Sequence, residues 1–190
     1  MEFTSKGLPV ATTSTPFSLC KGISEWRCTS LAGTEASDFV STYLRPANSS
    51  SATDFLYLLD ELNAYSHDLN AAVDLNGLRP ANEQVDHRDG LAATMAFVAI
   101  YVQRAEESEP ATWSGLQKPE VAKTISELWG QAERVMASSC GIANFGTEDK
   151  TFIRQFCDAK PQSSLQKILG RAPVCPAECL KFTPKTALGG

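Results

Sequence analysis

The sequence predicts an all-α protein, a bundle of about four to six helices whose terminal segments are stapled by disulfides. Three segments of about 20 residues carry apolar side chains at three- and four-residue steps, as one buried helix face requires. Runs of alternating β-branched residues between turn signals are missing, so no strand is expected. Six cysteines, grouped toward the two ends of the chain, supply the predicted staples.

The first two predicted helices cover 34–45 and 54–75. Thr34 is a suitable N-cap for the first, which ends before Pro46 because a residue preceding proline avoids the helical conformation. The second has the clearest stripe, and Gly77 just beyond it is a good stop. Its apolar positions are Phe55, Leu58, Leu59, Leu62, Tyr65, Leu69 and Val73.

The next two predicted helices cover 83–107 and 119–139. The first of them is apolar on most sides, which is typical of a central helix. The second starts at Pro119, a favourable first position, and has a regular apolar stripe that includes Trp129. Its other members are Val121, Ile125, Leu128, Ala132, Val135 and Met136.

Two shorter helices are expected at 148–158, with Thr147 as cap, and at 163–169, ended by Gly170. We therefore expect a flexible N-terminal segment over 1–18 and a helical domain over 19–170. We expect the Cys- and Pro-rich tail, 171–190, to pack on this domain or to be partly disordered.

The cysteines are Cys20, Cys28, Cys140, Cys157, Cys175 and Cys179. Disulfides are favoured over free thiols and over zinc, because only Cys175 and Cys179 stand at a spacing that suits a zinc ligand pair. Cys20 with Cys28 is a plausible local bridge. For the other four, the local scheme joins Cys140 to Cys157 and Cys175 to Cys179; a bridge that returns the C-terminal tail to the helices is equally plausible.

The net charge is −5, and the 17 basic residues are scattered. Nonspecific binding to nucleic acid requires clustered Lys and Arg, so no nucleic-acid partner is expected. The longest apolar stretch, Leu91 to Val102, is too short for a membrane span. No phosphate loop or dinucleotide fingerprint is present, and we expect no cofactor.

Both histidines stand beside acids, in His67-Asp68 and in Asp86-His87-Arg88-Asp89. If the helices 54–75 and 83–107 pack antiparallel, His67, His87, Asp86 and Asp89 become candidates for a metal site or a hydrolytic site at a helix junction. The alternative is ordinary helix-start chemistry, in which first-turn acids offset the positive helix end. We favour this alternative, because no paired-ligand spacing such as His-x-x-x-His is present.

Two tryptophans are candidate anchors for a partner. Trp26 lies in the short segment between Cys20 and Cys28, and Trp113 lies in a predicted loop, Glu109 to Gly115. Trp113 is also suited to covering the end of the bundle.

These features favour a secreted or periplasmic protein that acts by binding another protein, as an inhibitor, an immunity-type protein, an effector or an envelope component. We expect its signal peptide to be absent from this sequence. The alternatives are a secreted hydrolase with a carboxylate and histidine site, drawing on acids such as Asp60-Glu61 or Glu106-Glu107, and a small-ligand carrier. The sequence carries no information on oligomeric state.

Overall fold

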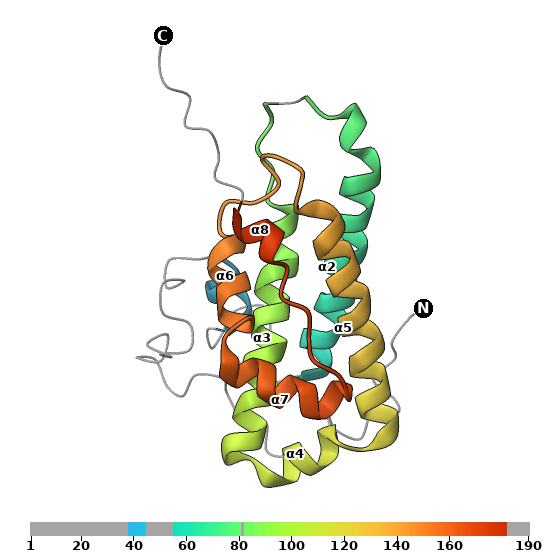
Figure 1. Cartoon of the computed structure of the whole chain (residues 1–190), viewed down its shortest axis with the longest axis vertical. Coiled ribbons are helices and arrows are strands. Elements are labelled where there is room, and N and C mark those ends of the chain that lie inside the picture. Colours follow the sequence, from blue (N-terminus) through green and yellow to red (C-terminus); the bar gives the residue numbers. More distant parts are fainter. Residues whose placement is uncertain (1–37, 45–54, 81, 182–190) are drawn as a thin grey trace.

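The computed structural model describes residues 38–44, 55–80 and 82–181 (Figure 1). This part of the chain is all-α, as predicted, with eight α-helices, one 3-10 turn and no strand. In chain order the elements are α1 (Asp38–Leu44), α2 (Phe55–Leu75), η3 (Asn76–Leu78), α3 (His87–Ser108), α4 (Pro110–Leu116), α5 (Pro119–Ser139), α6 (Asp149–Phe156), α7 (Ala159–Leu169) and α8 (Ala177–Lys181).

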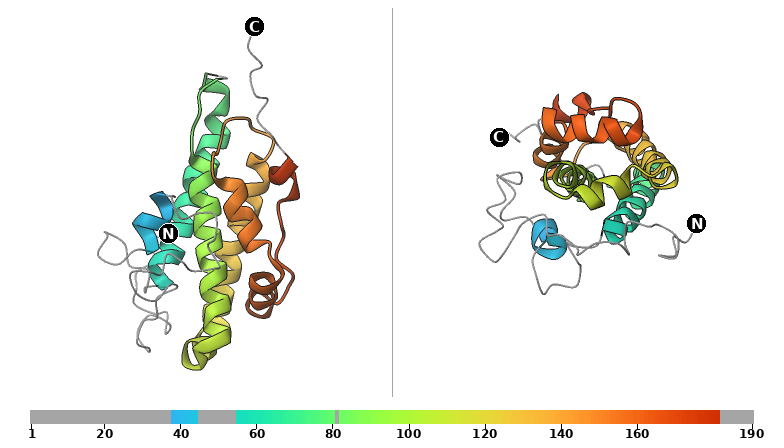
Figure 2. Two further views of the ribbon diagram at one scale, coloured as in Figure 1. Left: turned by 90° about the vertical axis from the view of Figure 1, so that its left-hand side faces the viewer. Right: turned by 90° about the horizontal axis from the view of Figure 1, so that it is seen from below.

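Helix α3 is the central helix of the bundle. Every residue from Arg88 to Val102 is buried, which confirms the prediction made from its apolar residues on most sides. It packs against α2, α5, α6 and α7, and two further views show these helices arranged around it (Figure 2).

Helices α2 and α5 each turn one apolar stripe toward the core. In α5 all seven predicted stripe residues are buried, and Trp129 is fully enclosed. In α2 the fully buried stripe ends at Leu69, and Val73 is only partly buried. The last turns of α2 therefore extend beyond the core, and they project from the bundle together with the connection to α3 (Figures 1 and 2).

Helix α4 covers Pro110–Leu116, so the prediction of a loop over Glu109 to Gly115 is wrong. Pro110 stands at the first turn of α4, where its fixed φ and missing N–H suit a helix start. Helix α8, in the tail, was also not predicted. Helix α7 starts four residues earlier than expected because Asp158 caps it, accepting a hydrogen bond from the Ala159 N–H at 2.7 Å.

Two disulfides join Cys140 to Cys179 and Cys157 to Cys175. The local pairing scheme is wrong, and the alternative of a tail bridged back to the helices is confirmed. Arg88 bonds both Ser139 and Asp149, so Cys140 lies near the start of α6, whereas Cys157 follows its end. An eight-residue helix is about 12 Å long, and a disulfide requires Cα atoms within about 7 Å. The tail runs back along the bundle and meets Cys157 and then Cys140 (Figure 1).

Cys20, Cys28 and Trp26 lie outside the described residues. Disulfides are typical of proteins from oxidising compartments, so the two bridges fit a location outside the cytoplasm. Within the described ranges, none of the helices combines the length and the apolar character that crossing a bilayer requires.

Candidate functional site

The two histidines do not converge with the acids beside them on a common centre. His87 Nδ1 lies 2.7 Å from an oxygen of Asp68, and its ring packs near Phe145. His67 is exposed on α2, and Asp86 is exposed where α3 begins. No group of three or more His, Cys, Asp or Glu side chains in the described part of the chain is arranged to hold a metal ion.

Asp89, the fourth candidate metal ligand, instead caps a different helix. Its carboxylate accepts the backbone N–H groups of Thr147, Glu148 and Asp149 at 2.6 to 2.9 Å, and the hydroxyl of Thr147 at 2.8 Å. Burial raises the pKa of Asp89, and these hydrogen bonds oppose the rise. The cap of α6 is thus Asp89 from α3, and the prediction of Thr147 as the cap is wrong.

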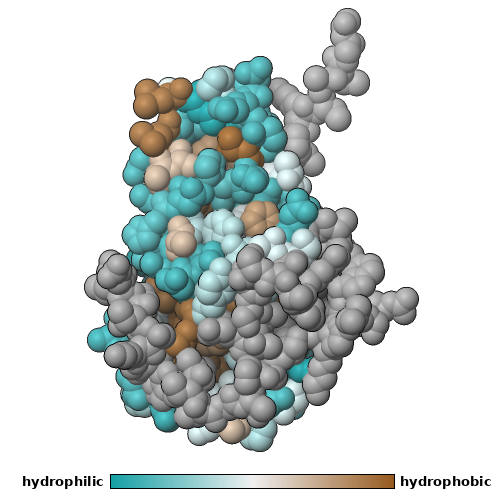
Figure 3. Space-filling view, turned by 180° about the vertical axis from the view of Figure 1, so that it is seen from behind, coloured by the Kyte–Doolittle hydropathy of each residue, from teal (hydrophilic) through white to brown (hydrophobic). Residues whose placement is uncertain are grey.

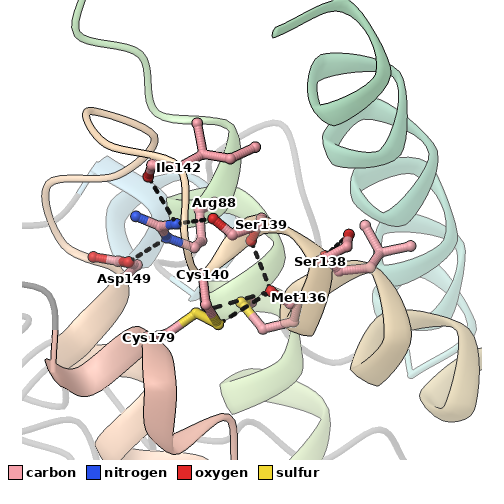
Figure 4. The surroundings of a disulfide bond; sticks show 9 residues. Arg88, Met136, Ser138, Ser139, Cys140, Ile142, Asp149 and Cys179 are labelled. Carbon is pink, nitrogen blue, oxygen red and sulfur yellow. Dashed lines mark hydrogen bonds and ion pairs between the residues drawn. A yellow bond between two sulfur atoms is a disulfide. The ribbon is translucent and has the colours of Figure 1, made fainter.

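Arg88 forms a buried ion pair directly beside a disulfide (Figure 4). Its Nε donates to Asp149 at 2.5 Å, and its Nη1 donates to the Ser139 carbonyl at 2.5 Å. Both charged side chains are almost fully buried. Ser139 immediately precedes Cys140, so this pair fixes the end of α5, the start of α6 and the bridged tail relative to α3.

Two of the other acids considered for catalysis, Glu61 and Glu106, take part in structural contacts between helices. Glu61 accepts the hydroxyl of Tyr43 at 3.0 Å, which ties α1 to α2. Glu106 pairs with Lys167 and ties α3 to α7. One acid of each pair, Glu61 and Glu106, therefore connects two helices in this structure.

The structure places Trp113 in α4, where it is partly buried and packs against the core. This geometry agrees with the alternative in which Trp113 covers the end of the bundle. An anchor for a partner is better sought among fully exposed apolar side chains.

The most exposed large apolar side chains lie at the projecting end of α2. Leu75 is 58% exposed and Leu78 is 83% exposed, and in the described residues only Val174 is comparable, at 57%. Seen from behind, this end of the molecule shows apolar surface standing out from a hydrophilic surround (Figure 3). We call Leu75 and Leu78, with the backbone that joins them, the leucine tip.

The leucine tip rests on a well-anchored connection. Arg79 follows directly, and its Nη2 donates to the carbonyl of Ala143 at 2.9 Å. Its guanidinium carbon lies 4.9 Å from the centre of the Phe145 ring, and its Nη1 donates to the carbonyl of Glu83. The Val85 N–H also donates to the carbonyl of Asn144 at 2.9 Å. The α5–α6 loop therefore fixes the position of the connection that carries the tip.

These leucines are not among the candidate site residues predicted from the sequence. The available signal was the pattern Leu75-Asn76-Gly77-Leu78, in which a large apolar residue stands on each side of a helix stop. We interpreted Asn76-Gly77 only as the end of a helix.

Comparisons of the chain with models of known protein families, with curated proteins and with solved structures gave no match. The fold and the site therefore define this protein only as a class: an all-α, disulfide-bridged bundle. Its distinguishing surface feature, within the described residues, is the anchored leucine tip.

Proposed function

We propose that this protein acts outside the cytoplasm, secreted or periplasmic, by binding another protein through the leucine tip. The observation that carries the proposal is the exposure of Leu75 and Leu78 on an anchored projection. The disulfides support the compartment. A role as inhibitor, immunity-type protein, effector or envelope component agrees with binding of this kind.

The energetics of the tip favour a role as an anchor. Transferring one exposed leucine side chain into an apolar pocket contributes at most about 1.5 to 3 kcal/mol, so two leucines together lie in the range of a binding hot spot. Arg79 and the α5–α6 loop hold the connection in place before any partner arrives. A pre-organised element loses less conformational entropy on binding, so more of this energy appears as affinity.

The test is capture from the extracellular or periplasmic fluid of the source organism with three forms of the full chain. These are the wild type, the double variant Leu75→Ser/Leu78→Ser and a matched control, Val174→Ser. Val174 is as exposed as Leu75 but belongs to the tail, where its N–H donates to Glu133 of α5. We expect the wild type and the control to retain the same protein, and the double variant to lose it by tenfold or more.

The substituted side chains are exposed, so each serine should change the free energy of unfolding by no more than about 0.5 kcal/mol. Urea titration of the variants checks this, and it separates lost binding from lost folding. Equal capture by the double variant and the wild type would show that the leucine tip does not carry the binding.

A further inference from the structure

We infer that the partner presents an apolar pocket bordered by lysine or arginine side chains. This inference rests on the proposed function and specifies the chemistry of the surface that receives the leucine tip. Three features of the projection carry it: its acidic side chains, the position of its single cation, and the uncompensated end of α2.

Exposed carboxylates flank the tip along the chain. Helix α2 contains four acidic residues and no Lys or Arg. Two of the four, Asp68 and Asp74, are exposed on its projecting half, and Asp74 directly precedes Leu75. The connection to α3 adds Glu83 and Asp86, both exposed.

The one basic residue of the connection, Arg79, is turned toward the bundle. Its guanidinium donates to the carbonyls of Glu83 and Ala143 and to the side chain of Asn76, and it lies over the Phe145 ring. Its charge therefore lies beneath the tip, on the bundle side. Asp68 is hydrogen-bonded to His87 Nδ1, and among the described residues no Lys or Arg forms an ion pair with the other three acids.

The backbone adds to the negative potential. The C-terminal end of a helix carries a partial negative charge, which basic residues in the last turn normally offset. Helix α2 has none in its last turn, and this end lies at the leucine tip. The acidic side chains and the end of the α2 backbone therefore both make the electrostatic potential at the leucine tip more negative.

A negative surface around an apolar anchor selects its partner by charge. A receiving surface rimmed with acids would be repelled, whereas one rimmed with Lys or Arg would be attracted during the approach and in the complex. The same repulsion opposes docking of the tip of a second copy of this chain onto the first. Attraction of this kind is screened beyond about 8 Å at physiological ionic strength, so binding should weaken as salt is added.

The test uses a displayed library of a small helical scaffold with one face randomised to apolar, basic and acidic residues in equal proportion. The full chain selects binders, and the Leu75→Ser/Leu78→Ser variant removes those that do not need the tip. We expect the recovered faces to carry several-fold more Lys and Arg than Asp and Glu around an apolar centre.

Affinities of the recovered binders are then compared across charge variants. Asp74→Lys/Glu83→Lys should weaken binding by tenfold or more, because it reverses two charges beside the leucines. Glu178→Lys, an exposed reversal on α8, is the matched control and should leave affinity within about twofold. Raising the salt should weaken wild-type binding more than binding by the Asp74→Lys/Glu83→Lys variant.

Three outcomes would overturn the inference. Leucine-dependent binders with equal basic and acidic content, or with no loss in Asp74→Lys/Glu83→Lys, would refute the charge argument and leave the tip as a binding element. Leucine-dependent dimerisation of the full chain in sedimentation velocity would identify a second copy as the occupant. Failure to recover any leucine-dependent binder would contradict the proposed function as well.

Discussion

Removing the Cys140–Cys179 disulfide should destabilise the protein more than removing Cys157–Cys175. The first bridge closes a loop of 39 residues and the second a loop of 18, which lies inside it. A bridge stabilises mainly by restricting the unfolded chain, and the restriction grows with the logarithm of loop length. Taken singly, the two loops correspond to about 3.9 and about 3.2 kcal/mol at 25 °C.

Nesting lowers the contribution of each bridge to the free energy of unfolding by about 0.6 kcal/mol and keeps their order. When the inner bridge is present, its 18 residues drop out of the outer loop, which leaves about 21. Cys140→Ala/Cys179→Ala should then cost about 3.3 kcal/mol, and Cys157→Ala/Cys175→Ala about 2.6 kcal/mol. Removing both should cost about 6.5 kcal/mol, which is about 0.6 kcal/mol more than the sum. Burial of Cys140 and Cys179 further increases the cost of removing the outer bridge, because truncating these side chains also leaves a void.

The assay is urea unfolding of the wild type and the two paired variants without reductant, followed by circular dichroism and by tryptophan fluorescence, to which the buried Trp129 contributes. Wild type kept in reductant is the matched control, and it should unfold at or below the midpoint of either variant. The loop argument would be refuted if Cys157→Ala/Cys175→Ala lowered the free energy of unfolding as much as Cys140→Ala/Cys179→Ala. It would show that the local contacts of each bridge set its contribution.

Two further predictions concern the packing around α3. Arg88→Met should cost about 3 to 5 kcal/mol of unfolding free energy, because it leaves the Asp149 carboxylate buried without its cation. Arg88→Met/Asp149→Asn should lower the free energy of unfolding less than Arg88→Met alone. A double variant less stable than the single variant would show that the unpaired Asp149 carboxylate is not the source of the destabilisation. Gly90→Ala should cost about 1 to 3 kcal/mol, because its new Cβ would lie 2.3 Å from two ring carbons of Tyr65. Gly77→Ala, where nothing lies within 4 Å, is the matched control; equal urea midpoints for these two alanine variants would rule out the steric argument.

The sequence predicted the long helices well because their signals are local. The stripe from Val121 to Met136 repeats every three or four residues within one element, and the predicted 119–139 matches α5. Helix α3 begins four residues later than predicted because Val85 and Arg88 give their N–H groups to the carbonyls of Asn144 and Phe145. Those acceptors lie about 60 residues away, and no local pattern indicates them.

The candidate site was harder to predict because exposure depends on where the bundle ends. Up to Leu75, the apolar pattern of α2 resembles any core stripe. Only the structure shows that the fully buried stripe stops at Leu69 and that the last turns project. In the same way, Asp89 is indistinguishable in sequence from a first-turn acid, although it caps α6 from another helix.

The nested bridges also determine what happens when the chain is cut. A protease that cleaves a peptide bond between Cys140 and Cys179 leaves two pieces joined by that disulfide. A cut between Cys157 and Cys175 leaves them joined by both. A single nick in α6, in α7 or in the tail before Cys179 would therefore release no fragment and would become visible only after reduction. Among proteases, such a protein stays in one piece after a single cut in its backbone within these loops.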